Sequence, residues 1–322
     1  RKWISDAASS SHFDPKTGEM VSFARQIGAP GSATMSHQVV NKEGVLTHNE
    51  RFESPYCALL HDFAITDNYV AYPMGPAIID PTRPSQGKPA LQWEGDRPSY
   101  LGILSRKGPD FTPRWIPMDP CFMWHTLNMF QEGQKLHVDL VAYKRLPRYD
   151  VGEDVRLAEN PEEYAGRLVR WTVDLEATTD EVHEEVLDEL ISEFPRMDER
   201  FMGQKHRHAF FLCQKGKTGP SRHWDAAVHL DFQTGKRSFY DPGPNSFVSE
   251  GVFTPRANST EEGDGYYVVP VYHEDHKHSE LVVLPALDFE AGPIAKVKLP
   301  FRQNPTFHSN FYPGLTQPTA AS

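Results

Sequence analysis

The chain has 322 residues and a formal net charge of −11, with 33 Lys and Arg against 44 Asp and Glu. This acidic balance argues against a nucleic-acid partner, because such surfaces carry an excess of basic side chains. No run approaches the ~20 apolar residues of a membrane-spanning helix, and no secretory signal opens the sequence, so integral membrane contact is not expected. Three widely spaced cysteines, Cys57, Cys121 and Cys213, fit the reduced thiols of a cytoplasmic protein.

Short, apolar, strand-like runs recur along the chain and are separated by turn sequences rich in Gly, Asn, Asp and Pro. The turn unit DPKTGEM near the N-terminus recurs as DFQTGKR in the second half, which indicates repeated hairpins. Repetition at this spacing favours an all-β protein, either a β-propeller or a similar closed assembly of small sheets. The predicted strands cover residues 45–53, 68–74, 99–106, 114–118, 135–144, 168–175, 208–214, 226–235, 236–241, 266–275, 279–287 and 295–301.

Two stretches suggest a short helical interlude within this pattern. Residues 160–168 place Pro161 and acidic residues where a helix would begin, and residues 180–194 space their apolar side chains on one helical face. We interpret the acidic face of the second stretch as solvated surface. No convincing linker is present, so a single domain over residues 1–322 is expected, and the oligomeric state stays open.

Three histidines lie in apolar, strand-like runs: His61 in LLHDFAIT, His125 in FMWHTLNMF and His308 in PTFHSNFYPG. Such flanks withdraw an imidazole from water, and an unpaired buried nitrogen costs roughly 1–3 kcal/mol. A metal ion on one nitrogen and a carboxylate on the other would satisfy each ring. One such histidine is more often an ordinary core residue, but three together favour a buried metal centre. Five others stand among polar neighbours and are predicted to be exposed: His206, His208, His273, His276 and His278.

The neighbours of these histidines carry a family resemblance. LLHDFAITDNYVAYPM resembles the His-Asp-Phe-Ala-(Ile/Val)-Thr segment of the carotenoid cleavage oxygenase family. CFMWHTLNMFQEG is similar to that family's Phe-His-x-x-Asn-Ala-(Phe/Tyr)-Glu-(Asp/Glu)-Gly segment. Residues 193–211 (beginning EFPRMD), 249–256 (SEGVFTPR) and 279–314 resemble three further family blocks in the same order. On these five motifs the chain is identified as a member of the family.

The resemblance implies a seven-bladed β-propeller with one Fe(II) on its axis, held by four histidines. Three of them carry over by motif, namely His61, His125 and His308. The family also orients its ligand histidines with glutamates, and Glu193 and Glu250 match two of those positions. Such a glutamate accepts the distal imidazole N–H and fixes the tautomer. Iron held by neutral imidazoles, with positions left open, suits the activation of O2 as co-substrate.

The first family ligand is where this sequence departs from the pattern. SSSHFDPKTGEM matches the family segment from Asp14 onward, but the family histidine four positions earlier would fall on Ser10. His12, two positions before Asp14, is assigned as the fourth ligand, and a three-histidine centre is the alternative. Family members usually extend further, mostly before this ligand, so N-terminal blades and a third orienting glutamate are expected to be missing.

The segments RHAFFL and SRHWD look most like the lignostilbene- and resveratrol-cleaving branch. This similarity implies a dioxygenase that cleaves the C=C bond of a stilbene-type phenolic substrate into two aldehydes. The alternatives are cleavage of an apocarotenoid or carotenoid, and an inactive propeller that lacks a ligand. No catalytic side chain beyond the metal ligands is assigned. Five aromatic residues either line a hydrophobic pocket for the alkene or pack between blades: Phe63, Phe122, Trp124, Phe130 and Phe307.

Overall fold

The computed structural model describes residues 10–26, 28–108, 110–147, 160–215, 223–304 and 307–312. Strands dominate these residues, which confirms the all-β prediction. The helical elements within the described ranges are single 3-10 turns: η1 (Arg83–Gln86), η3 (Pro161–Tyr164), η4 (Glu199–Phe201) and η5 (Phe289–Ala291). None of these turns has the length or the apolar composition that a membrane crossing requires.

The first half of the chain forms antiparallel sheets from strands that mostly follow one another in sequence. The strand order is β1-β2-β3-β4 in the first sheet, β5-β6-β9-β10 in the second and β7-β8 in a separate hairpin. The bounds are β1 (Ser11–Phe13), β2 (Met20–Arg25), β3 (Thr34–Val40), β4 (Leu46–Glu53), β5 (Ala64–Ile65), β6 (Tyr69–Met74), β7 (Ala77–Ile79), β8 (Leu91–Trp93), β9 (Ser99–Ser105) and β10 (Arg114–Met118).

Three further sheets follow, with the orders β11-β12-β13-β14, β15-β16-β17-β18 and β19-β21-β22-β23, and β20 also pairs with β21. The bounds are β11 (Phe122–Glu132), β12 (Lys135–Tyr143), β13 (Arg167–Asp174), β14 (His183–Asp188), β15 (Ser192–Arg196), β16 (His208–Cys213), β17 (Ala226–Asp231), β18 (Lys236–Tyr240), β19 (Ser246–Val248), β20 (Val252–Pro255), β21 (Gly265–His273), β22 (His278–Pro285) and β23 (Ala295–Lys298). All twelve predicted strands are present, within a few residues at their ends.

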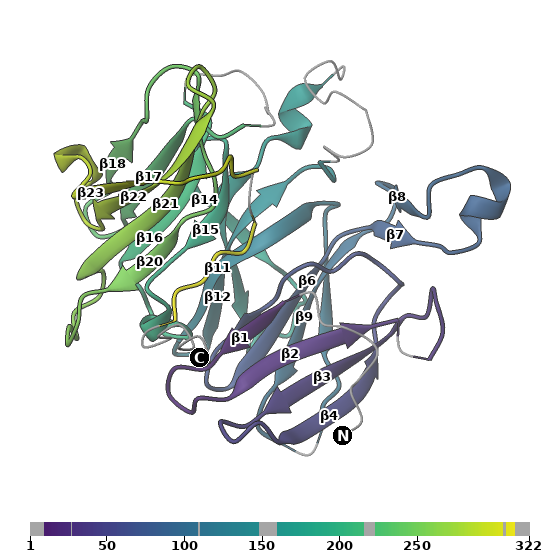
Figure 1. Cartoon of the computed structure of the whole chain (residues 1–322). Coiled ribbons are helices and arrows are strands. Elements are labelled where there is room, and N and C mark those ends of the chain that lie inside the picture. The colour runs from purple at the N-terminus through teal and green to yellow at the C-terminus, as the bar shows by residue number, and fades with distance from the viewer. Residues whose placement is uncertain are drawn as a thin grey trace, which may run out of the picture.

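Alternation along the strands packs successive sheets against one another. In β16, which is buried throughout, Ala209 and Phe211 face the β11–β14 sheet, whereas Phe210 and Leu212 face the β19–β23 sheet. Because successive side chains of a strand point to opposite faces, one buried strand can serve two neighbouring cores. Four apolar clusters fill the spaces between consecutive sheets in this way. The sheets therefore follow one another as propeller blades do, from purple to yellow-green in Figure 1.

The first strand of each blade-like sheet carries or adjoins a predicted site residue. His12 lies in β1, His125 in β11 and Glu193 in β15. His61 precedes β5, and Glu250 precedes β20. The C-terminal segment after β23 crosses back toward the middle of the molecule, where it brings His308 among them (Figure 1). The fold thus gathers residues that are up to about three hundred positions apart in sequence.

The predicted helical interlude is wrong. Residues 161–164 form a single 3-10 turn, and residues 180–194 contain β14 and the start of β15 in place of a helix. Glu184 and Glu185 of β14 are exposed because this strand is the outer edge of its sheet, where charges discourage further strand pairing, whereas Asp188 at its end is buried. Pairing with β13 overrides a spacing that also suits an amphipathic helix.

Two histidines predicted to be exposed are buried. His206 is 5% exposed, and its Nδ1 lies 3.0 Å from the side-chain amide nitrogen of Asn128, a hydrogen-bond donor. His208 is 6% exposed, and its Nδ1 lies 3.0 Å from Nε2 of His229. Polar neighbours in sequence therefore misled the prediction, because the partners that shelter these rings come from other strands. His276 is exposed as predicted, while His273 and His278 are half-buried.

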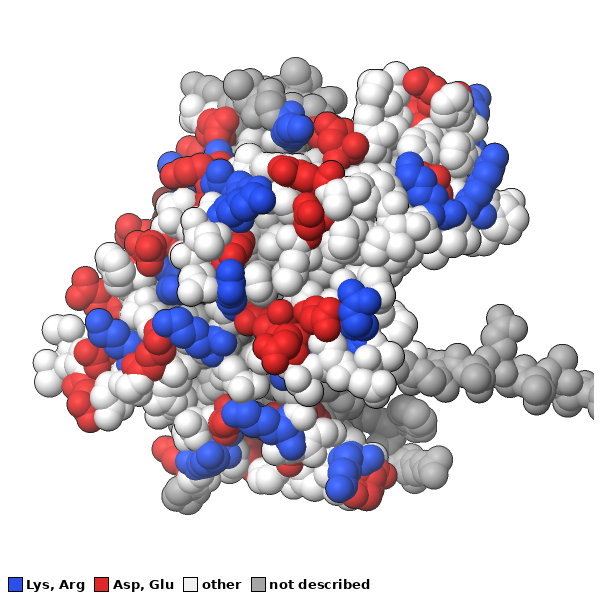
Figure 2. All heavy atoms as spheres, turned by 90° about the vertical axis from the view of Figure 1, so that its left-hand side faces the viewer, with Lys and Arg blue, Asp and Glu red and all other residues white. Residues whose placement is uncertain are grey.

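Acidic and basic side chains are mixed on the face that Figure 2 presents, which includes the β18, β22 and β23 side of the molecule. Ion pairs between strands or within loops elsewhere in the structure include Arg207–Asp231 and Arg256–Asp264. No extended basic area lies on this face, which agrees with the acidic overall charge. Cys57, Cys121 and Cys213 are free thiols, and only Cys213 is fully buried.

Candidate metal centre

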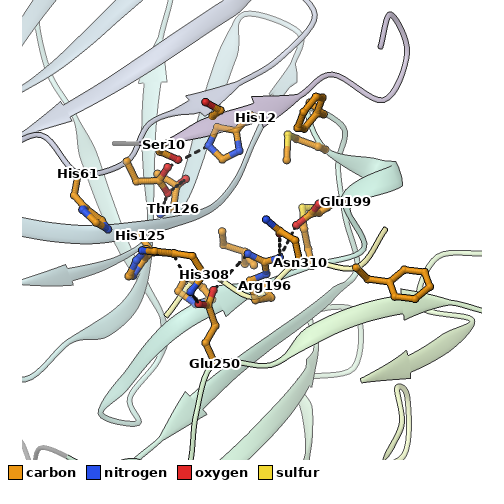
Figure 3. Close-up of a pocket in the computed structure, with 18 of the residues that line it drawn as sticks. Ser10, His12, His61, His125, Thr126, Arg196, Glu199, Glu250, His308 and Asn310 are labelled. Atoms are coloured by element: carbon orange, nitrogen blue, oxygen red, sulfur yellow. Dashed lines mark hydrogen bonds and ion pairs between the residues drawn. The ribbon is translucent and has the colours of Figure 1, made fainter. Parts of the chain in front are cut away.

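Three histidines from three different parts of the chain converge near the centre of the molecule. His61, His125 and His308 each offer one ring nitrogen, and these nitrogens all lie within 4.8 Å of one another. Their ring centroids are 5.0–5.4 Å apart. Figure 3 shows the three side chains pointing toward a common space. This is the donor set and spacing that a transition-metal ion could draw together with small side-chain movements.

His125 shows most directly that the site suits a metal. Its Nδ1 lies 2.7 Å from Oε2 of Glu193, so this nitrogen donates its proton to the carboxylate. Its Nε2 is buried and has no hydrogen-bond partner among the described residues. A buried acceptor without a partner is costly, and a metal ion at this nitrogen would remove the cost. The β11–β12 register shifts on both sides of Thr126, and this irregularity turns the His125 region toward the axis.

Glu193 is held in place by its own strand irregularity. The β15–β16 register shifts between Glu193 and Arg196, and Phe194 adopts a φ of 55°. A positive φ is unfavourable for a bulky residue, so the surrounding structure must impose it. The backbone N–H of Phe194 in turn donates to Oε2 of Glu193. The predicted role of Glu193 as the partner of a ligand histidine agrees with this geometry.

Glu250 plays a related but different part from the predicted one. It is 2% exposed, and its Oε2 accepts the backbone N–H of His308. The ring Nδ1 of His308 lies 3.8 Å from the same oxygen, too far for a hydrogen bond. Glu250 therefore positions the backbone of His308, whereas Glu193 holds the ring of His125. His308 has a φ of 65° and a half-exposed side chain, so it is less buried than its apolar flanks predict.

Arg196 was quoted in the sequence motif but not assigned a role, and the structure gives it one. Its guanidinium donates to the carbonyl of Ser309 and to Oδ1 of Asn310, each at 3.1 Å. It also lies 3.4 Å from Oε1 of Glu250. These contacts fasten the segment that carries His308 onto the blades. The available signal was the position of Arg196 three residues after Glu193, but its partners Ser309 and Asn310 are more than one hundred residues away in sequence.

His12 lies in the wall of the same cavity but outside the group of three (Figure 3). Its Nε2 is 2.7 Å from the carbonyl oxygen of Phe63 and 3.2 Å from Oδ1 of Asp62. The other oxygen of Asp62 accepts hydrogen bonds from the backbone N–H and the hydroxyl of Thr126, at 2.9 and 2.8 Å. Asp62 thus links His12 to the strand of His125, a role that sequence reasoning missed. Ser10 also lines the cavity.

The surroundings of the site shift the pKa values of its histidines in opposite directions. Burial, reinforced by the neighbouring His125, lowers the pKa of His61 to about 4. Burial and His125 also lower the pKa of His308. Burial works against the charged form of His125 too, but Glu193 outweighs it and raises its pKa. His61 and His308 are therefore neutral at pH 7 and present lone pairs, as metal ligands must.

A cavity of about 360 Å³ adjoins the three histidines. Its wall combines apolar side chains, such as Leu127, Met197 and Met202, with polar groups that include Arg196 and Asn310. The five aromatic residues considered as pocket lining are absent from this wall. Phe63, Phe122 and Phe130 are fully buried, Phe63 and Phe122 in the clusters between sheets; Trp124 packs against one of these clusters, and Phe307 is 64% exposed.

The blades, the axial histidines and their carboxylate partners define a β-propeller protein with a candidate metal site on its axis. A family model described as retinal pigment epithelial membrane protein matches residues 3–313. The chain belongs to this family, the carotenoid cleavage oxygenases.

Individual relatives agree with this assignment. Isoeugenol monooxygenase of Pseudomonas nitroreducens is 32% identical over 309 residues, which are 94% of this chain and 64% of that protein. The crystal structure of Pseudomonas brassicacearum lignostilbene dioxygenase superimposes with a TM-score of 0.83 at 33% identity, over 92% of this chain and 64% of that one. For cobalt-substituted apocarotenoid oxygenase of Synechocystis the TM-score is 0.81 at 26% identity, over 92% and 62%. The chain therefore spans under two thirds of the length of these relatives.

Proposed function

We propose that this chain holds the iron centre of an oxygenase that uses O2 to cleave the C=C bond of a phenolic, stilbene-type alkene. The observation that carries the proposal is the convergence of His61, His125 and His308, with the unpartnered Nε2 of His125 backed by Glu193. An all-imidazole donor set with open positions suits Fe(II). Relatives named as oxygenases of aromatic alkenes support the substrate class.

Iron at this site would supply the activation of O2, and the protein residues would prepare and enclose it. Glu193 accepts the Nδ1 proton of His125 and so aims the Nε2 lone pair at the common space. Glu250 and Arg196 hold the segment of His308 in register with the other two ligands. Asp62 and Thr126 join the segment that carries His61 to β11, which carries His125. No side chain is needed as a general acid or base, since a metal and O2 carry this chemistry.

The cavity favours a compact aromatic substrate. Its volume of about 360 Å³ lies at the lower end of the range for small-molecule sites. Methionine and leucine side chains would pack on an aromatic ring, while polar groups such as Asn310 would face a phenolic hydroxyl. A long carotenoid would need an extended apolar tunnel, and this mixed wall provides less support for one. Apocarotenoid cleavage therefore stays the second candidate, supported by the similarity to the Synechocystis enzyme.

The number of oxygen atoms transferred is a separate question, because some relatives are named monooxygenases and others dioxygenases. We propose the dioxygenase outcome, in which both aldehyde products carry oxygen from O2. Turnover in 18O2, with mass spectrometry of rapidly trapped aldehydes, distinguishes the two. Label in both products supports a dioxygenase, and label in one product supports a monooxygenase.

The function is tested with anaerobically purified protein reconstituted with Fe(II) and offered a hydroxystilbene, isoeugenol or an apocarotenal. We expect one iron per chain and aldehyde products from the two phenolic alkenes. His125→Ala should abolish both iron binding and turnover, while His183→Ala, an exposed histidine in β14, should change neither. Turnover of the apocarotenal alone would favour the second candidate. Failure to bind iron would identify an inactive propeller.

His12 requires its own variant because its predicted role as a fourth ligand is not tested by the geometry alone. If His12 turns Nδ1 toward the metal, His12→Ala should lower the iron content sharply. If the site has three histidines, His12→Ala should retain stoichiometric iron, since Nε2 of His12 then serves Phe63 and Asp62. Iron content after gel filtration measures the difference.

A further inference from the structure

A second group of metal-binding side chains lies on the β21–β22 hairpin, away from the axial site. The hairpin sequence HEDHKHSE places three histidines and two glutamates within residues 273–280. His273 and His278 are direct partners across the two strands, and Glu280 follows two residues later on the same face as His278. In Figure 1 these strands lie in the group of sheets at the upper left.

The hairpin residues converge as closely as the axial histidines do. His273, His278 and Glu280 each offer one ligand atom, and these atoms all lie within 4.8 Å of one another. The His273 and His278 rings have centroids 4.8 Å apart. The ring of His276, on the turn, lies 5.9 Å from that of His278. Glu280 is 8% exposed, so its carboxylate is not a freely solvated surface charge.

The hydrogen bonds of His273 prepare one of its nitrogens for a cation. Oγ of Ser246 lies 2.8 Å from Nδ1 of His273 and donates to the carbonyl of Pro244 at 3.2 Å, an arrangement that favours the ring proton on Nδ1 of His273. In the neutral ring, Nε2 then presents a lone pair toward Oε1 of Glu280, which is 2.9 Å away. With the ring proton on Nδ1, these two electron-rich atoms together attract a cation, either a proton or a metal ion. A hydroxyl on the distal nitrogen is also the kind of partner that orients metal-bound histidines.

We propose that His273, His278 and Glu280 bind a zinc-like divalent cation. Two imidazoles and one carboxylate form a common donor set for such ions, and His276 or water would complete a tetrahedral shell.

Lys296 carries a positive charge that opposes the binding of a cation at this site. Its ammonium lies 3.3 Å from Oε1 of Glu280, the same oxygen that faces His273. A divalent cation must therefore displace or outcompete this amine, which is half-exposed and free to swing into solvent. This competition makes a specific prediction, because removing the charge with Lys296→Gln should strengthen binding. A purely structural histidine cluster gives no reason for that effect.

The test is Zn2+ titration by isothermal calorimetry and equilibrium dialysis on the full chain. A His125→Ala background removes the axial contribution, and the assignment is then checked in the wild-type chain. We expect His278→Ala to weaken zinc binding at the hairpin site by roughly tenfold or more, and Lys296→Gln to strengthen that binding. His183→Ala, on the exposed face of β14, is the matched control and should leave zinc affinity unchanged.

A second readout reports the binding residues directly. Zinc should shift the imidazole NMR signals of His273 and His278 in the wild-type chain and should raise its melting temperature. In His278→Ala the shift of the His273 signal should be lost. In the His125→Ala background, which removes the axial site, His278→Ala should also abolish the rise in melting temperature, while circular dichroism shows that the fold remains. Zinc affinity that is equal in the wild type, His278→Ala and Lys296→Gln would overturn the proposal. The outcome does not depend on the proposed oxygenase activity, since neither readout requires turnover.

Discussion

At the scale of single residues, the axial site depends on carboxylates that fix the direction of imidazole rings. Glu193 is 3% exposed and keeps one oxygen on Nδ1 of His125, while its Oε1 has no hydrogen-bond partner among the described residues. Such a carboxylate carries a desolvation cost that its contacts must offset. A cation at the histidines would offset part of that cost by adding positive charge close by.

Glu193→Gln therefore tests the orienting role with little change of shape. We expect iron retention to fall by about 10–100-fold, because an amide is a weaker acceptor and can present its NH2 group to His125. Iron affinity is measured by competition with a chelator of known affinity. Glu189→Gln changes an exposed carboxylate nearby and should leave retention unchanged. Equal retention in the two variants would contradict the assignment.

Several site residues could be predicted from sequence, and others could not. His61, His125 and Glu193 lie in short motifs whose neighbours identify them. The backbone contact of Glu250, the docking role of Arg196 and the bridge through Asp62 depend on partners distant in sequence. The side-chain to backbone hydrogen bonds of these residues leave no periodic pattern that a sequence could display.

At the scale of elements, twelve strands could be predicted from the alternation of side chains and from turn sequences, whereas β14 could not. The apolar residues of β14 are spaced as in an amphipathic helix, and the same residues also suit an edge strand that pairs on one side with β13. The strand is decided by tertiary pairing, which local propensity does not contain. The longer strands β2 and β3 were not predicted either, and short strands such as β5 and β20 were missed because two to four residues carry too little pattern.

Gly102 in β9 illustrates how an element can depend on a missing side chain. A Cβ at Gly102 would lie 2.5–2.8 Å from ring atoms of Trp115, its cross-strand partner in β10. The indole Nε1 also donates to the carbonyl of Glu53, which ties this sheet to the first one. Gly102→Ala should therefore lower the free energy of unfolding by about 1–3 kcal/mol through overpacking.

Urea unfolding measures this cost, and a double-mutant cycle identifies its cause. In a Trp115→Leu background the same Gly102→Ala substitution should cost much less, since the ring that it meets is gone. A cost that persists undiminished without the indole would show that the backbone, and not the tryptophan, requires glycine at this position.

At the scale of the whole molecule, buried neutral histidines in several sheets should make the fold sensitive to acid. Burial lowers the pKa of His37 and of His229 to about 4, and that of His206 to about 3. In the unfolded chain these rings titrate near 6.5. Between pH 6.5 and 4 the unfolded state therefore binds more protons, so stability falls as the pH falls.

His206→Gln isolates one contribution to this slope. The ring packs near Arg170, whose positive charge adds to burial in lowering its pKa, and near Asp139 and Asn128. Protonation of the unfolded state alone should remove on the order of 2 kcal/mol at pH 5 for this residue. Chemical unfolding at pH 7 and pH 5 should show a smaller loss in the variant than in the wild type. Parallel losses would indicate that His206 is already charged in the folded protein.

The overall architecture was predictable because the family motifs and the repeated hairpins agree, and the structure confirms an all-β, propeller-type arrangement. The order in which the sheets pack follows from strands that are buried on both faces, such as β16. The exposure of individual histidines was less predictable, because burial is decided between blades rather than along the sequence.

The segment that carries His308 has a consequence for the integrity of the chain. It follows the last strand and is attached by polar contacts from Glu250 and Arg196 rather than by a sheet. An ion bound by the three histidines would cross-link this end of the chain to the first strands of other blades. Occupancy of the site and docking of the segment are then thermodynamically linked, so each strengthens the other. Metal binding should therefore slow limited proteolysis at sites after His308. The ion that takes part in the chemistry would also stabilise the attachment of the C-terminal segment.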